Sequence, residues 1–96
     1  MRKFLTGAIV VTRKIIDEIN RDHSFGDFID ESLGKYINCD WGNSPECDKE
    51  MNDQAIINGS RIFASYEYTN NSTSKKIWII TEADRSYTTI LFPHEY

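Results

Sequence analysis

Apolar residues follow two different periods along the chain, and the change of period separates a helical part from a strand part. Residues 4–11, with the sequence FLTGAIVV, are apolar and β-branched, which predicts a strand. Thr12 can cap the helix that we expect next. In that helix three isoleucines fall on one face, at Ile15, Ile16 and Ile19.

Two further helices are predicted between residues 24 and 58. After Ser24 the apolar residues recur every three or four positions, and Ser24 and Asp27 have the spacing of a capping box. The third helix is predicted to begin at the sequence SPE, residues 44–46, where a capping hydroxyl precedes a proline and an acid. It should end before Gly59, which suits a left-handed cap. One stripe of this helix carries Cys47, Met51, Ala55 and Asn58.

The last third of the chain alternates with a period of two. Residues 61–69 alternate in this way, and a polar loop over residues 70–74 leads to a second strand over residues 76–82. The sequence EADRS, residues 82–86, turns the chain again before a final strand over residues 87–92. Three successive strands with short loops predict an antiparallel meander.

These elements give the order β-α-α-α-β-β-β and predict an α+β fold. A chain of 96 residues is expected to form a single domain over residues 1–96. We expect the helices to pack on one face of a mainly antiparallel four-stranded sheet. The pattern does not say which strand the first one pairs with, although an edge position is favoured.

The charge is unevenly distributed, which changes the view of the third helix. The first 38 residues hold six basic and six acidic residues, while the other 58 hold five basic and nine acidic ones, so the net charge is −4. The acids gather around the predicted third helix, where Lys49 is the single base. An acidic surface is a poor binder of nucleic acid but suits a basic protein surface. The acids of this segment are Asp40, Glu46, Asp48, Glu50 and Asp53.

Composition narrows the class of protein. No run of about 18 apolar residues is present to span a membrane. The start of the chain resembles a signal peptide only briefly and is interpreted as the first strand, so we expect a cytoplasmic protein. Cys39 and Cys47 are eight residues apart and neither His23 nor His94 has ligand spacing, so we expect no metal and no cofactor.

The EADRS turn has three interpretations. Glu82, Asp84 and Arg85 could form a structural corner, part of a binding surface, or a carboxylate pair for acid–base chemistry. The structural interpretation is favoured, with Asp84 accepting backbone N–H bonds and Arg85 bonding an acid or the carbonyls of another loop. No nucleophile motif surrounds Ser86, so we expect no enzymatic activity.

Aromatic residues also allow two interpretations. Trp41 could be an exposed interface anchor or could fill the layer between helices and sheet, and the second is favoured. Tyr66, Tyr68 and Trp78 could form a platform for stacked bases. Few basic residues are interleaved with them, so the core interpretation is favoured.

Three stretches between Asp40 and Tyr96 form a specific pattern: DWGN at residues 40–43, MNDQAIINGSRIFASY at residues 51–66 and KIWIITEADRSYTTILFPHEY at residues 76–96. In these stretches the chain resembles a family of small bacterial proteins carried on phages, plasmids and conjugative elements. Cys39 departs from the glycine that the family tends to have, and the loop over residues 68–76 is longer. The resemblance implies a setting on mobile DNA and brings no enzymatic activity with it.

Two functions fit this setting. The first is a non-enzymatic acidic protein that inhibits a host-defence complex, as anti-CRISPR or anti-restriction proteins do, by docking on its basic nucleic-acid-binding surface. The alternative is an accessory protein for transfer, replication or regulation of the element, with an element-encoded partner. The candidate partner-binding residues are Asp40, Trp41, Glu46, Asp48, Glu50, Asp53, Glu82, Asp84 and Arg85.

Overall fold

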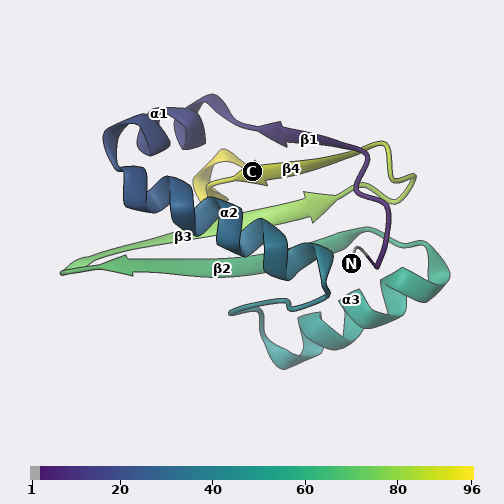
Figure 1. Ribbon diagram of the computed structural model, residues 1–96. Coiled ribbons are helices and arrows are strands. Elements are labelled where there is room, and N and C mark those ends of the chain that lie inside the picture. Colours follow the sequence, from purple (N-terminus) through teal and green to yellow (C-terminus); the bar gives the residue numbers. More distant parts are fainter. Residues whose placement is uncertain (1–2) are drawn as a thin grey trace.

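The elements follow one another in the expected order β-α-α-α-β-β-β in a computed structural model that describes residues 3–96 (Figure 1). The chain is an α+β fold with a four-stranded mixed sheet. A short 3₁₀ turn, η1, follows the last strand. The elements are β1 Ala8–Val11, α1 Arg13–Arg21, α2 His23–Ile37, α3 Glu46–Asn58, β2 Ile62–Asn70, β3 Thr73–Thr81, β4 Tyr87–Leu91 and η1 Pro93–Glu95.

The spatial order of the strands is β1-β4-β3-β2. The predicted meander is confirmed, since β2 pairs antiparallel with β3 and β3 with β4. β1 does lie at an edge, but it pairs parallel with β4, so the sheet is mixed. β2 offers no place for β1, because the segment from residue 42 to Asn52 already bonds its outer edge.

Gly7 allows the chain to enter β1 close to the turn between β3 and β4. Its φ of +64° lies in the left-handed region, and a Cβ there would come 2.3 Å from the carbonyl oxygen of Ser86. The next residue, Ala8, donates its N–H to that same oxygen over 3.2 Å. The close approach therefore fixes the register of the parallel pair.

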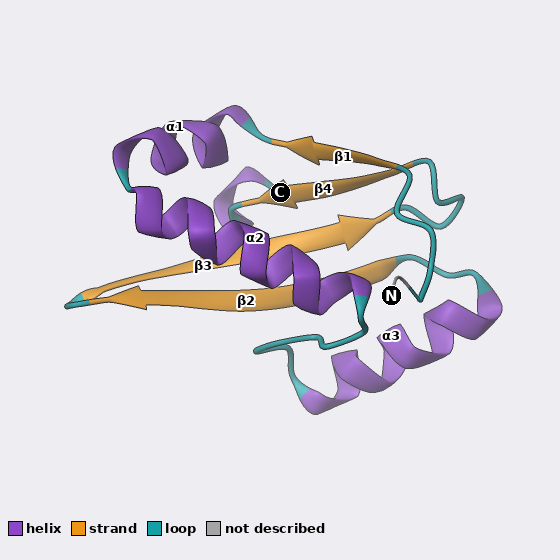
Figure 2. Cartoon of the chain, in the orientation of Figure 1, coloured by secondary structure: helices purple, strands orange, loops and turns teal. Residues whose placement is uncertain are grey.

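The core lies between one face of the sheet and the first two helices (Figure 2). The alternation predicted for β2 is confirmed, because every second residue from Ile62 to Tyr68 is buried against the helices. α3 differs from the expectation that all helices share one face: it runs beside β2 at the edge of the sheet. Buried core residues on the helices are Ile15, Phe25, Ile29, Tyr36 and Ala55.

Helix ends were predicted with mixed success. Thr12 caps α1 as expected, accepting from the N–H of Ile15. α2 has Asp22 as its cap, bonded to the N–H of Ser24, so the capping box predicted at Ser24 is wrong. An aspartate two residues earlier in the chain takes the N-cap position, so that Ser24 lies in the first turn of α2 and its own N–H is the capped group. Gly59 ends α3 in the left-handed conformation, as predicted.

Aromatic residues of the sheet divide between its two faces. Tyr66 and Tyr68 belong to the buried core, which confirms the core interpretation for both. The core interpretation is wrong for Trp78, which lies on the opposite face, half-buried between Phe63 and Tyr96. The loop expected over residues 70–74 is shorter than predicted, since both strands continue almost to the turn at Asn71.

Candidate functional site

α3 carries most of the acidic residues that were predicted to bind a partner. Glu46 and Asp48 lie in its first turn, where negative charge is favourable. Ser44 does not cap the helix as predicted. Its hydroxyl donates to the carbonyl oxygen of Trp41 over 2.7 Å and accepts the N–H of Ser65 over 2.9 Å. The hydroxyl is therefore used to attach the preceding loop to β2.

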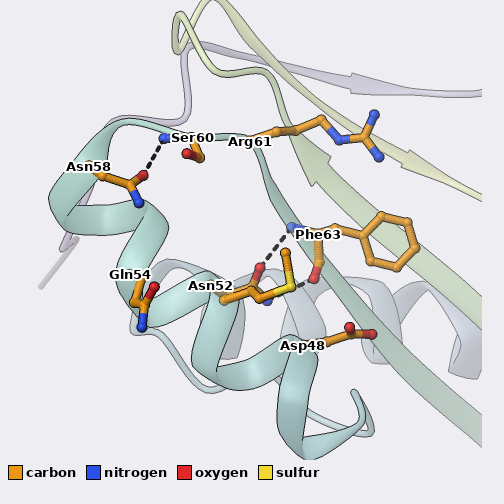
Figure 3. Close-up of a pocket in the computed structure, with 8 residues that line it drawn as sticks. Asp48, Asn52, Gln54, Asn58, Ser60, Arg61 and Phe63 are labelled. Atoms are coloured by element: carbon orange, nitrogen blue, oxygen red, sulfur yellow. Dashed lines mark hydrogen bonds between the residues drawn. The ribbon is translucent and has the colours of Figure 1, made fainter.

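Asn52 attaches α3 to the outer edge of β2. Its side-chain amide donates to the carbonyl oxygen of Phe63 over 2.7 Å and accepts the N–H of the same residue over 3.1 Å (Figure 3). Asn52 is 3% exposed. Of the stripe formed by Cys47, Met51, Ala55 and Asn58, the structure buries Ala55 and leaves the other three exposed, because the polar side chain of Asn52 makes the contact with β2.

Arg85 attaches the other end of α3 to the turn between β3 and β4. Its guanidinium donates to the carbonyl oxygens of Ala55 and Ser60 over 3.0 and 2.7 Å. The carbonyl oxygen of Ala55 also accepts the N–H of Gly59, so Arg85 adds a second, charge-assisted bond at the C-terminal end of α3, where a cation is favourable. Sequence reasoning had suggested carbonyls of another loop, and the structure places them at the end of α3.

The remaining EADRS residues are engaged locally. Asp84 accepts the N–H of Ser86 over 2.9 Å, as predicted for a turn aspartate, and bonds from Ser86 hold the pKa of Asp84 below its usual value. The N–H of Glu82 bonds to the carbonyl oxygen of Tyr87 and closes the hairpin. Arg85 adopts a φ of +60°, a conformation that usually favours glycine. In this strained backbone conformation, the guanidinium of Arg85 points toward the end of α3.

Trp41 lies inside the protein and is 3% exposed, so it is not available as a surface anchor. Its ring packs against Phe4 and Tyr36, and its indole N–H donates to Asp53 over 2.9 Å. The interpretation of Trp41 as a filler between helices and sheet is confirmed. Asp40 keeps an exposed side chain that accepts the N–H of Gly42.

Three exposed acids follow one side of α3 at spacings of four and three residues, which places them on one helical face. We call Glu46, Glu50 and Asp53 the acidic ridge. Asp48 lies on another side of the helix and lines a groove instead. Lys49 approaches Glu46 to 3.9 Å, a surface pair that offsets little of the ridge's charge.

The groove between α3 and β2 has a volume of about 530 Å³ (Figure 3). Arg61 lies along one wall, bonded to the hydroxyl of Tyr96 and close to the ring of Phe63. Met51 is 68% exposed on the opposite wall. Sequence reasoning missed Asn52 and Arg61 as parts of this region, since no local pattern marks an asparagine that will meet a strand edge.

The titratable groups show where burial prevents ionisation. Burial raises the pKa of the Tyr36 and Tyr66 hydroxyls, and it also raises the pKa of the Cys39 thiol. Tyr36 bonds to Thr81 over 2.6 Å, and Tyr66 donates to the carbonyl oxygen of Asp40. These hydroxyls therefore act as neutral hydrogen-bonding groups inside the core.

Residues 3–96 contain neither a metal-binding cluster nor a membrane-spanning helix. No group of three or more His, Cys, Asp or Glu side chains in that range could hold a metal ion. In the same part of the chain, no helix is long and apolar enough to cross a membrane.

Comparison with known proteins adds no identification: no family model, curated protein or solved structure matches this chain.

Proposed function

We propose that this protein is a non-enzymatic acidic binding protein of mobile genetic elements that inhibits a bacterial host-defence complex of the CRISPR or restriction type. It docks through α3 on the basic surface where that complex handles nucleic acid. The observation that supports this proposal is the acidic ridge, in which Glu46, Glu50 and Asp53 are exposed on one side of a helix.

The length of the ridge suits a short stretch of nucleic-acid backbone. Glu46 and Asp53 are seven residues apart, which corresponds to about 10 Å at a helical rise of about 1.5 Å per residue. One strand of DNA advances about 3.4 Å per nucleotide, so this length covers about three phosphates. A basic channel that holds a few phosphates would thus meet a comparable row of carboxylates.

The ridge is held in a defined position, which favours binding because little ordering is left to the encounter. Asn52 bonds α3 to the edge of β2, and Arg85 bonds the carbonyls at its end. Asp53 itself accepts the indole N–H of Trp41. The acidic ridge of α3 is therefore held in place by hydrogen bonds at Asn52, Asp53 and the C-terminal end of the helix.

Catalysis is not part of the proposal. Arg85 is committed to backbone carbonyls and Asp84 to Ser86, so these two charged side chains of the EADRS turn have structural partners. Of the two, Arg85 supports α3 from its C-terminal end.

Charge reversal on α3 tests the proposal. The ridge variant replaces the ridge acids Glu46 and Glu50, together with Asp48 on the groove side of the same helix, by lysine. It leaves the third ridge acid, Asp53, because Asp53 bonds Trp41. The matched control replaces Asp17, Asp27 and Asp30, three exposed acids of α1 and α2, and changes the net charge equally. The readout is phage plating on bacteria that carry an active CRISPR or restriction system.

Wild-type protein and the control variant should raise plating to the same level, while the ridge variant should plate like empty vector. Circular dichroism should confirm that all three proteins fold. Equal protection by the ridge variant would show that α3 charge is not the means of docking. No protection by wild type against any system tested would overturn the inhibitor function and favour an element-encoded partner.

A further inference from the structure

Exposed apolar side chains surround the edge of the sheet that β1 forms. Eight large apolar side chains are exposed among residues 3–96, and five of them belong to β1, to the segments that flank it in sequence or to the facing end of β4. Ile9 and Val10 are successive strand residues and point to opposite faces of the sheet, so these side chains surround the β1 edge on both faces. A concentration of this kind around one edge of a small protein marks an interaction surface. We call these five the β1 patch: Leu5 68%, Ile9 43%, Val10 44%, Ile16 46% and Tyr87 42% exposed.

The backbone of β1 also has free hydrogen-bonding groups on this side. Ala8 donates its N–H to the carbonyl oxygen of Ser86, and Thr12 donates to that of Ile90, both over 3.2 Å. Bonding directions alternate along a strand, so Ile9 and Val11 direct their N–H and C=O groups away from β4. Within residues 3–96 no strand pairs with that outer side.

The sequence of β1 carries little protection against pairing. Edge strands are commonly guarded by charged residues or proline, and residues 4–12 contain neither. The opposite edge shows what protection looks like in the same molecule: Asn43, Ser44 and Asn52 bond the outward N–H groups of β2. β1 is short and apolar, and its outer side is bare.

We propose that β1 is a homodimer interface, in which the β1 strands of two copies of this chain pair antiparallel across a two-fold axis. The two sheets would then form one continuous sheet of eight strands. Pairing by strand addition uses the free backbone groups for affinity and the neighbouring side chains for specificity. This inference does not depend on the proposed function of α3.

The bounds of β1 select one register. If Ile9 of one copy lies opposite Val11 of the other, both outward-facing residues exchange bonds, which gives four hydrogen bonds in total. Shifting the axis onto Ile9 would require Gly7 to pair, and its φ of +64° is not extended. Shifting it onto Val11 would require Arg13, which already belongs to α1. Val10 therefore lies on the axis and faces its own copy.

A second copy is the occupant that the surface suits best. The strand has no charge to match an oppositely charged partner, and an uncharged apolar strand is complementary to itself without like-charge repulsion. A standard interface buries about 800 Å² on each partner, and four backbone bonds are not enough to provide it. The five partly exposed side chains of the β1 patch add the apolar area that the short strand lacks.

The dimer would place the two copies of α3 far apart. α3 flanks β2, which lies at the opposite edge of the sheet from β1. Joining two β1 edges therefore leaves each acidic ridge at an outer end of the eight-stranded sheet. Both ridges remain accessible, so the dimer presents two separate copies of the same helix.

The mass of the full chain in solution tests the proposal. Sedimentation equilibrium over a concentration series should move from the 11.2 kDa monomer toward twice that mass. Val10→Lys should keep the chain monomeric at concentrations where wild type is dimeric, because two lysines would face each other on the axis. Ile57→Lys, at a position 88% exposed on α3, is the matched control and should dimerise like wild type.

Cross-linking then tests the register. In a chain with Cys47→Ser, Val10→Cys should form a covalent dimer with oxidised glutathione, whereas Ala8→Cys should react several-fold less. The Cys47→Ser chain alone sets the background from Cys39. A monomer at every concentration overturns the proposal. A dimer that persists in the Val10→Lys variant and leaves Val10→Cys uncross-linked overturns it equally.

Discussion

The two edge strands of the sheet, β1 and β2, differ in whether other parts of the chain bond their outward-facing backbone groups. At β2 the chain's own loop and helix α3 cover the edge, with Asn43, Ser44 and Asn52 bonding outward backbone groups. At β1 the outward groups of Ile9 and Val11 have no such cover within residues 3–96. The comparison shows that short polar side chains can bond the outward backbone groups of an edge strand, whereas the apolar side chains of β1 have no group that could do so.

Replacing Asn52 by leucine should have the largest effect, because it opens the covered edge. The N–H and C=O of Phe63 would both lose their partner. Unsatisfied groups cost about 1–3 kcal/mol each when buried, so we expect a loss of about 2–4 kcal/mol in the free energy of unfolding. Urea denaturation measures it, with the exposed Asn20→Leu on α1 as control. A change below that of the control would contradict the role assigned to Asn52.

Replacing Arg85 by alanine should loosen α3 from its other end. The guanidinium bonds to Ala55 and Ser60 would be lost, and we expect a cost of about 1–2 kcal/mol. Arg85→Lys should be more stable than Arg85→Ala but less stable than wild type, since one ammonium group cannot bond both carbonyl oxygens as the planar guanidinium does. Thermal unfolding measures the effect, with the exposed Arg13→Ala on α1 as control. If lysine and arginine proved equal, charge alone would explain the contact.

Placing a charge on the bare edge should barely affect the fold of the monomer. Val10 is 44% exposed and points away from the helices, so Val10→Lys should change the free energy of unfolding by no more than about 0.5 kcal/mol at monomeric concentrations. Urea denaturation of the dilute protein provides the measurement. A loss as large as that of Asn52→Leu would mean that the β1 edge is as firmly covered as the β2 edge.

The stability of the protein should depend weakly on pH through Asp84, in the turn that contacts α3. Bonds from Ser86 lower the pKa of Asp84 below its ordinary value of 3.8. A lowered pKa in the folded state contributes stability that is present above pH 3.8 and is lost as the pH falls through the folded pKa. Asp84→Asn should remove this dependence, as seen in melting temperatures between pH 6 and pH 2. An unchanged pH profile in the variant would contradict it.

The sequence predicted those parts of the fold that depend on local periodicity. The alternation of β2, the cap at Thr12 and the stop at Gly59 are each written into a few neighbouring residues, and each is confirmed. The turn role of Asp84 is also local and confirmed. These features follow from backbone geometry that a short stretch of chain determines by itself.

Contacts between distant segments could not be read in the same way. Asn52 meets Phe63 eleven positions away, and Arg85 meets Ala55 thirty positions away, so no spacing rule connects them. The parallel pairing of β1 with β4 depends on which edge α3 has already covered. The acidic ridge was predicted as a charged face, but which of its acids are exposed depends on the side that Asn52 turns toward β2.

Hydrogen exchange at the two edges, followed residue by residue by NMR over a range of protein concentrations, tests the comparison most directly. The amides of Phe63, Ser65 and Glu67 should be protected at every concentration, because the chain's own side chains bond them. The amides of Ile9 and Val11 should exchange fast in dilute protein and slow as the concentration rises. Protection of Ile9 and Val11 at the lowest concentration, or fast exchange at the highest, would contradict the account of an open edge that a second copy closes.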